Sequence, residues 1–266
     1  MRALDADIGN ANALVVDSDA AWRSIVAAML RNLGIGRVQS CSNAREARPM
    51  LEAAWHDIVV CADPPAPARH PEDLAALRAA GLLPASTLVV LICADPLRAR
   101  HAEAVELADV CLLLPCTEHA LGERLAQARQ RQHALGDVIA ALQQGRHAEV
   151  DRLCRARHAV RAPYWVHALR LGAQLHLDHG NARAARELYE AVLASRPLPW
   201  AQLGLARSLA ALGDAPAARQ LLLQLQAEHP LYAEARQAWS ETARRNRVPH
   251  RAAGRPAQVS VAPQAL

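Results

Sequence analysis

Short apolar runs separated by amphipathic segments make up the first half of the chain. The central run, residues 57–63, is too short for a helix, and Pro64 and Pro65 follow it at once. This pattern predicts a strand buried on both faces. Similar runs occupy residues 14–19, 88–93 and 110–115, with a weaker one at 38–41. Because helical patterns separate these runs, we expect an α/β domain with a parallel sheet.

The segments between the runs carry helical periodicity. Apolar residues from Trp22 to Leu33 recur at alternating spacings of three and one, and Gly34 supplies the stop. Asn43 and Glu46 form a plausible N-cap pair for a helix that ends near Ala54. Further helices are expected near residues 72–80, 96–108 and 117–132, which gives five strand-helix units in all.

The amino-acid composition excludes some kinds of catalytic chemistry. All 30 basic residues are Arg, so no lysine is present to act as a Schiff base, general base or phosphate clamp. Of the six Cys, five lie in the first half, mostly in apolar runs, which favours small buried side chains and leaves a thiolate metal site as a minor alternative. The chain contains no apolar run of membrane-spanning length and no export signal at residues 1–7, so we expect a cytoplasmic protein.

Residues 12–132 resemble the receiver domain of two-component response regulators. The resemblance rests on residues 15–19, on residues 57–63 and on the Leu114-Pro115 pair that closes the last run. In that family an acidic pair after the first strand holds Mg²⁺, and an aspartate ending the third strand accepts the phosphoryl group. A Ser or Thr ends the fourth strand and a Lys-Pro pair ends the fifth; the metal and the lysine neutralise the phosphoryl oxygens. The resemblance therefore implies a flavodoxin-like (βα)5 fold.

The chain departs from the receiver pattern at most of these sites. The acceptor position falls on Ala62 when it is counted from Asp57, but on Asp63 when it is counted back from Cys93. A shift of one residue reverses the face of a strand side chain, so Asp63 can serve as the acceptor only if a bulge absorbs the shift. The remaining positions of this degenerate pocket are Asp17, Ser18, Asp19, Cys93, Cys111 and Leu114.

These departures predict a pseudo-receiver that works without phosphorylation and needs no cofactor. Cysteine is only a weak donor and leucine cannot neutralise a phosphoryl oxygen, so a phosphorylated Asp63 would lack the contacts that drive switching. One alternative is a phosphorylatable regulator in which Asp63 is the acceptor and Mg²⁺ is held by Asp17 with Asp19 or Asp63. The other is an unrelated flavodoxin-like domain.

A repeat occupies the second half. Gly180, Ala185, Tyr189 and Pro197 recur 33 residues later as Gly213, Ala218, Leu222 and Pro230, and a fainter copy begins at Gly145. A helix, a glycine turn, a second helix and a closing proline resemble tetratricopeptide repeats, here over residues 137–230 with a capping helix at 231–245. We assign residues 133–246 to this all-α domain, with generic helical hairpins as the alternative. The continuous pattern over 117–144 predicts a rigid connection to the receiver.

Repeats of this kind form a concave groove that binds peptides or partner helices. Projection from the glycines predicts that the groove is lined by His167, Arg170, Gln174, Trp200, Leu203 and Arg207. Arginine there suits a partner that carries carboxylates, although any single surface Arg can equally be solvated. We therefore expect a protein partner, a sensor kinase or another signalling protein, in this groove.

Residues 247–266 are rich in Pro, Ala and Arg without periodicity, and we expect a disordered basic tail. The tail has no interleaved aromatics, which argues against nucleic acid as its ligand. The chain also lacks a P-loop, a G-x-S-x-G turn and a His-Glu-x-x-His motif, so we do not expect an enzyme. The whole resembles the bacterial regulators that join a receiver to tetratricopeptide repeats, and we expect a non-catalytic signalling adaptor.

Overall fold

The computed structural model describes residues 6–63, 77–78 and 80–245. Its first half is a parallel sheet in the order β2-β1-β3-β4-β5. The strands are β1 (Asn12–Val16), β2 (Arg37–Cys41), β3 (Ile58–Asp63), β4 (Leu88–Cys93) and β5 (Val110–Leu113). This strand order is that of the flavodoxin-like fold, as the sequence predicted.

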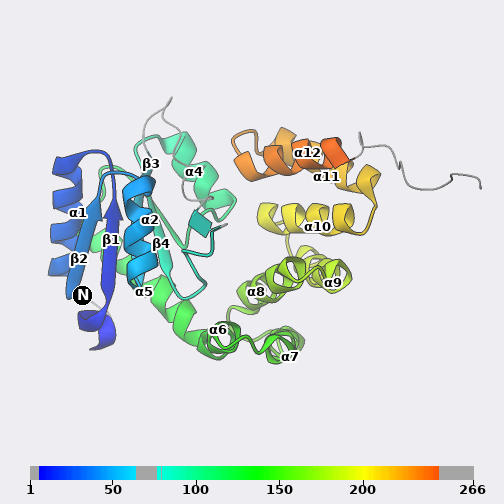
Figure 1. Cartoon of the computed structure of the whole chain (residues 1–266), viewed down its shortest axis with the longest axis horizontal. Coiled ribbons are helices and arrows are strands. Elements are labelled where there is room, and N and C mark those ends of the chain that lie inside the picture. The colour runs from blue at the N-terminus through cyan, green and yellow to red at the C-terminus, as the bar shows by residue number, and fades with distance from the viewer. Residues whose placement is uncertain (1–5, 64–76, 79, 246–266) are drawn as a thin grey trace, which may run out of the picture.

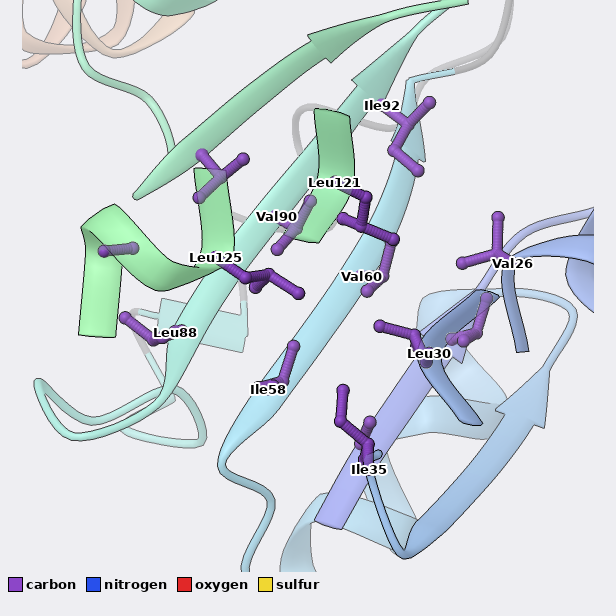
Figure 2. Close-up of a cluster of buried hydrophobic side chains, with 14 of the residues drawn as sticks. Val26, Leu30, Ile35, Ile58, Val60, Leu88, Val90, Ile92, Leu121 and Leu125 are labelled. Carbon is purple, nitrogen blue, oxygen red and sulfur yellow. The ribbon is translucent and has the colours of Figure 1, made fainter. Parts of the chain in front are cut away.

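Helices cover both faces of the sheet. They are α1 (Ala20–Asn32), α2 (Ala44–Ala53), α4 (Pro96–Ala104) and α5 (Glu118–Ala134), and a short 3-10 helix (Ala6–Asn10) precedes β1. On one face, side chains of α1 and α5 meet alternate residues of the strands, and Figure 2 shows Leu30, Val60 and Leu121 in this layer. The other alternate residues meet α2 and α4 on the opposite face. Two apolar layers therefore bury β3 and β4 on both sides, which explains their unbroken apolar sequence.

The second half consists of helices that pack in chain order. They are α6 (Gly136–Gln143), α7 (His147–Ala159), α8 (Trp165–Asp178), α9 (Ala182–Leu193), α10 (Pro199–Ala211), α11 (Ala215–Glu228) and α12 (Ala233–Arg245). Each helix contacts the next one along the chain. Figure 1 shows them stacked in an arc whose concave side faces the sheet domain.

Three glycines end the first helix of successive hairpins in the same way. Gly145, Gly180 and Gly213 have φ values of 65°, 74° and 90°, a left-handed conformation in which glycine carries no Cβ penalty. At Gly180 the N–H donates to the Leu177 carbonyl at 3.0 Å, and the next N–H, of Asn181, donates to the His176 carbonyl at 2.8 Å. The same pair of bonds recurs at the other two glycines. This is the Schellman motif, so the periodic glycines are helix stops, as their spacing predicted.

The connection between the halves is short. α5 ends and α6 begins at the single residue Leu135, whose side chain is buried in the core of the helical half. The predicted continuity over 117–144 is therefore interrupted by one residue, next to Gly136. Most of the helix predicted at 72–80 and the whole of the tail 247–266 lie outside the described residues, although Leu77 and Arg78 are helical. No helix among the described residues is long and apolar enough to span a membrane.

The tightest helix crossing yields a stability prediction. A Cβ added at Gly204 of α10 would lie 2.2 Å from Cζ of the buried Tyr189 ring on α9. We expect Gly204→Ala to lower the free energy of unfolding by about 2 to 3 kcal/mol, because the ring cannot move without displacing the core. Gly136→Ala is the matched control, since no atom lies within 4 Å of its added Cβ. Urea unfolding checks this, and equal stability of the two variants would contradict so close a crossing.

Candidate functional site

The acidic residues after β1 are held by backbone donors. Asp17 is buried, and its Oδ1 accepts the Asp19 N–H at 2.8 Å. Asp19 is the N-cap of α1, because its Oδ1 accepts the N–H groups of Ala21 and Trp22 at 2.8 and 3.1 Å. The strand predicted to extend to residue 19 therefore ends at Val16, and Asp19 has a structural role that requires no metal.

A guanidinium lies beside this acidic pair. Nη1 of Arg23 donates to the carbonyl oxygens of Asp17 and Ser18, at 2.6 and 3.2 Å. The side chain of Ser18 is exposed. A fixed positive charge one turn into α1 thus lies against the backbone of Asp17 and Ser18, in addition to the partial positive charge of the helix N-terminus.

The pairing of β3 with β4 shows which residues are neighbours at the ends of these strands. The two strands pair without a bulge from Ile58↔Leu88 to Asp63↔Cys93, and Ala62 is opposite Ile92. Asp63 therefore shares a row of the sheet with Cys93, and this pairing contains no bulge that would absorb the one-residue shift. Whether Asp63 is an acceptor stays a prediction. The side chain of Asp63 lies outside the described part of the chain.

The neighbouring strand ends carry apolar or weakly polar side chains. Cys93 is fully buried, and its carbonyl accepts the N–H of Leu114 at 2.8 Å. Leu114 packs against the apolar layer that contains α1 and α5. Burial raises the pKa of the Cys111 thiol to about 11, so this thiol is protonated at neutral pH. At these three positions the pocket supplies no cation and no strong hydrogen-bond donor.

The described residues do not assemble a metal site. Across residues 6–63, 77–78 and 80–245, with the side chains of Asp7 and Asp63 excepted, no three His, Cys, Asp or Glu side chains are grouped as ligands. Cys41, Cys61 and Cys111 lie in one row of the sheet. Val16 separates the first two and Leu91 the last two, so no two of these thiols are on adjacent strands.

The concave side of the helical half contacts a segment of the sheet domain. Residues 105–107, which we call the α4–β5 corner, follow α4 and lead into β5. One carboxylate oxygen of Glu106, Oε2, lies 3.1 Å from Nη1 of Arg170 on α8, and the Glu106 carbonyl accepts from Nη2 of the same guanidinium at 3.3 Å. The guanidinium carbon of Arg170 lies 4.8 Å from the centroid of the Trp200 ring on α10. One arginine thus joins α8, α10 and the corner.

Apolar contacts surround this ion pair. Val105 is 1% exposed and belongs to a buried cluster whose other core members all come from α10, α11, α12 and the turn before α12, among them Leu203, Leu222 and Tyr232. Leu107 packs against this cluster and also against the core of the sheet domain. Nη1 of Arg78 donates to the Leu107 carbonyl at 2.6 Å. Val105 is therefore buried against the helical half, and Leu107 packs against both halves.

The backbone of the corner is strained. α4 was predicted to reach residue 108, but it ends at Ala104, and the Glu106 and Leu107 N–H groups donate to the carbonyls of Glu103 and Ala102. These are the bonds of a Schellman motif, with Glu106 in the left-handed position at φ 49°. Glutamate at this position costs about 1 to 2 kcal/mol relative to an unstrained conformation. The three repeat turns use glycine there, whereas this turn carries a carboxylate that reaches Arg170.

The six residues predicted to line the groove have different environments. His167 and Arg170 face Glu106, and Trp200 and Leu203 are buried. Gln174 and Arg207 are exposed, and Gln174 donates to the Asp178 carboxylate at 2.7 Å. The structure thus brings four of the six to the region of the corner. Whether an outside partner uses these residues stays a prediction.

Sequence reasoning did not identify the corner itself. Val105, Glu106 and Leu107 continue the helical pattern of α4, and nothing local marks them as contact residues. The one available signal is Glu106, which has no arginine within five residues on either side. Arg170 lies 64 residues away along the chain.

Comparisons with known proteins concern the first half of the chain. No protein-family model matches the chain, and no curated protein matches it. Among solved structures, it is similar to the chemotaxis response regulator CheY4 of Vibrio cholerae, at 20% identity and a TM-score of 0.39, over 44% of this chain and 98% of that one. A second structure of the same protein, crystallised at pH 4.0, matches at 22% identity and a TM-score of 0.38 over the same shares. The likeness concerns the fold alone.

The histidine beside the corner predicts a dependence of stability on pH. Burial, with Arg131, Arg170 and Arg196 nearby, lowers the pKa of His167 to about 4, although Nε2 lies 3.9 Å from the Glu106 carboxylate. The unfolded chain protonates this imidazole near pH 6.5, so between pH 6.5 and 4 the unfolded state binds more protons. The free energy of unfolding should therefore fall as the pH drops through this window, by on the order of 2 kcal/mol from His167.

Denaturant unfolding at pH 7 and pH 5 measures this effect. His167→Gln should reduce the loss of stability on acidification, while His119→Gln should leave it unchanged, because the His119 side chain is 69% exposed. Equal pH dependence in wild type and His167→Gln would contradict a buried neutral imidazole.

Proposed function

We propose that this chain is a non-catalytic signalling adaptor of the bacterial two-component type. In this proposal an atypical receiver is coupled to a protein-interaction domain of the tetratricopeptide type, and neither needs a cofactor. The observation that carries the proposal is the chemistry at the ends of β4 and β5. Fully buried Cys93 and apolar Leu114 occupy the places where a phosphorylated receiver needs a hydroxyl and a cation.

The environment of the acidic pair supports the same proposal. Asp17 and Asp19 accept backbone N–H groups, and Arg23 donates to the adjacent carbonyls. A Mg²⁺ ion would have to compete with the helix N-terminus for Asp19 and would meet the Arg23 guanidinium. Binding of metal and phosphoryl group would then bring little preference for a second conformation, and without such a preference there is no switch.

The alternative is a phosphorylatable regulator. It is favoured by one observation, the pairing of Asp63 with Cys93 at the ends of adjacent strands. In this alternative Asp63 accepts the phosphoryl group, and Asp17 holds Mg²⁺ with Asp19 or with Asp63.

Beryllofluoride separates the two functions. We expect Mg²⁺ with beryllofluoride to leave the melting temperature unchanged, because Cys93 and Leu114 cannot hold the fluoride atoms. In the alternative, saturation at about 100 times the Kd stabilises the folded state by about 2.7 kcal/mol and raises the melting temperature by several degrees. A rise that disappears in Asp63→Asn would establish the phosphorylatable regulator. Differential scanning calorimetry provides the measurement.

The interaction role is tested at the repeat groove. We expect the double change Arg170→Ala, Arg207→Ala to weaken capture of the partner from native cell extract at least about tenfold, since each charge-assisted contact contributes about 1.5 to 3 kcal/mol when it is shielded from water. The readout is the quantity of captured protein, and circular dichroism controls for folding. Arg183→Ala, Arg186→Ala on α9 is the matched control, because it also removes two arginines. Retention of capture by the groove variant would place the partner elsewhere.

A further inference from the structure

The repeat groove already holds an acidic segment in this structure. The α4–β5 corner carries one carboxylate between two aliphatic side chains, Val105 and Leu107. Val105 meets an apolar cluster of the helical half, and Glu106 meets Arg170. Leu107 packs against both this cluster and the core of the sheet domain. The chemistry expected of an outside partner is thus present inside the same chain.

Val105 is the apolar part of this contact. It is a residue of the sheet domain, yet its burial comes from the cluster around Leu203, Leu222 and Tyr232. Ring contacts on the same side extend the interface, since the His101 ring lies 6.1 Å from Tyr232 and 6.2 Å from His229. If the two halves separated, Val105 would become exposed, whereas the core layers of the sheet domain would stay intact.

Glu106 is the charged part. Its side chain is 27% exposed and that of Arg170 34%, so the ion pair is partly shielded from water. The strained φ of Glu106 shows that the chain tolerates an unfavourable backbone at the residue that makes the contact. An unstrained glycine would close α4 equally well but could not reach Arg170.

The groove retains a donor that the corner does not satisfy. Within the described residues, the indole Nε1 of buried Trp200, which can only donate, has no acceptor. This ring lies under Arg170. The Nε1 atom is itself buried, so the corner leaves this donor unsatisfied within the interface.

We propose that the α4–β5 corner is an internal ligand of the repeat groove, and that an outside protein displaces it with a segment of the same kind, a carboxylate flanked by aliphatic side chains. This inference rests on the proposed function, because it takes the groove as the partner site. The partner gains access only in molecules whose corner has left the groove, so its apparent affinity is reduced by the fraction that is open. The tether gives the corner a high effective concentration, which keeps that fraction small.

A synthetic peptide of residues 95–109 serves as the probe. It contains α4 from its N-cap Asp95 through the Schellman turn at Glu106. Val105→Asp opens the full-length chain, because a carboxylate cannot enter the cluster around Leu203. We expect the labelled peptide to bind Val105→Asp at least about tenfold more tightly than wild type, measured by fluorescence anisotropy. Arg170→Ala added to Val105→Asp should abolish this gain, and so should Glu106→Gln in the peptide.

Leu97→Asp is the matched control, because Leu97 is on α4 and 69% exposed. It should bind the peptide as weakly as wild type does. Equal affinity for wild type and Val105→Asp, or no binding to Val105→Asp, would overturn the proposal, because a vacated groove must accept its own ligand.

A second pair of variants covers the case in which Val105→Asp does not fold. Glu106→Arg should open the chain by repulsion from Arg170, raising the radius of gyration in solution scattering and the affinity for the peptide. Glu106→Arg with Arg170→Glu restores an ion pair and should return the radius of gyration to the wild-type value. An unchanged radius in Glu106→Arg, or no recovery in the double variant, would contradict the role of this contact.

The outcomes separate the two proposals. If the peptide does not bind the open chain but the Arg170→Ala, Arg207→Ala variant loses partner capture, the adaptor stands and the internal ligand is wrong. If the peptide binds the open chain but the arginine variant captures the partner as wild type does, the groove serves only the contact within the chain. The adaptor function assigned to the groove then fails.

Discussion

The ion pair between Glu106 and Arg170 joins the two halves of the molecule. It connects the turn after α4 to the helices α8 and α10, and an apolar cluster around Val105 excludes water from one side of it. At the other end of the interface, the single residue Leu135 connects α5 to α6. Two fixed points of this kind limit the relative motion of the halves, because a rotation about one of them must break the other.

Polar groups at the strand ends and at the interface find their partners in different parts of the chain. At the strand ends the polar groups are satisfied locally: Asp19 caps α1, Asp17 accepts a backbone N–H, and Arg23 donates to carbonyls. At the interface the polar groups come from distant parts of the chain. The hydrogen bonds at the strand ends stabilise the sheet domain by itself. The contacts at the interface contribute stability only while the two halves are together. A signal that acts on the interface can therefore change the shape of the protein without altering the sheet.

Backbone constraints set the geometry of the surface that the helical half provides. Schellman turns at Gly145, Gly180 and Gly213 end their helices in the same way, so successive hairpins repeat their geometry and leave one concave side. The close approach of Gly204 to Tyr189 fixes how α9 and α10 cross. The packing of these helices places the Arg170 guanidinium over the Trp200 ring, where it also contacts Glu106 of the corner.

The sequence by itself determined the elements and their class. Apolar runs buried on both faces marked β3 and β4, and the spacing of the glycines marked the hairpins, because hydrophobic periodicity and the left-handed conformation are local properties. The sequence also placed Cys93 at the end of one strand and Leu114 at the end of the next, and the structure has them at the ends of β4 and β5. It left the register of Asp63 open, since one residue of slip cannot be seen without the neighbouring strand.

Tertiary structure alone decided where the groove residues point and what they meet. The carboxylate expected opposite Arg170 belongs to the same chain, 64 residues earlier. Nothing in the periodicity of α4 distinguishes Val105 and Glu106 from other residues of a surface helix. Their role depends on the curvature of the helix stack and on the direction in which α5 enters α6, and both result from packing between residues far apart in sequence. Local patterns cannot encode a contact whose energy exists only once two domains have folded and met.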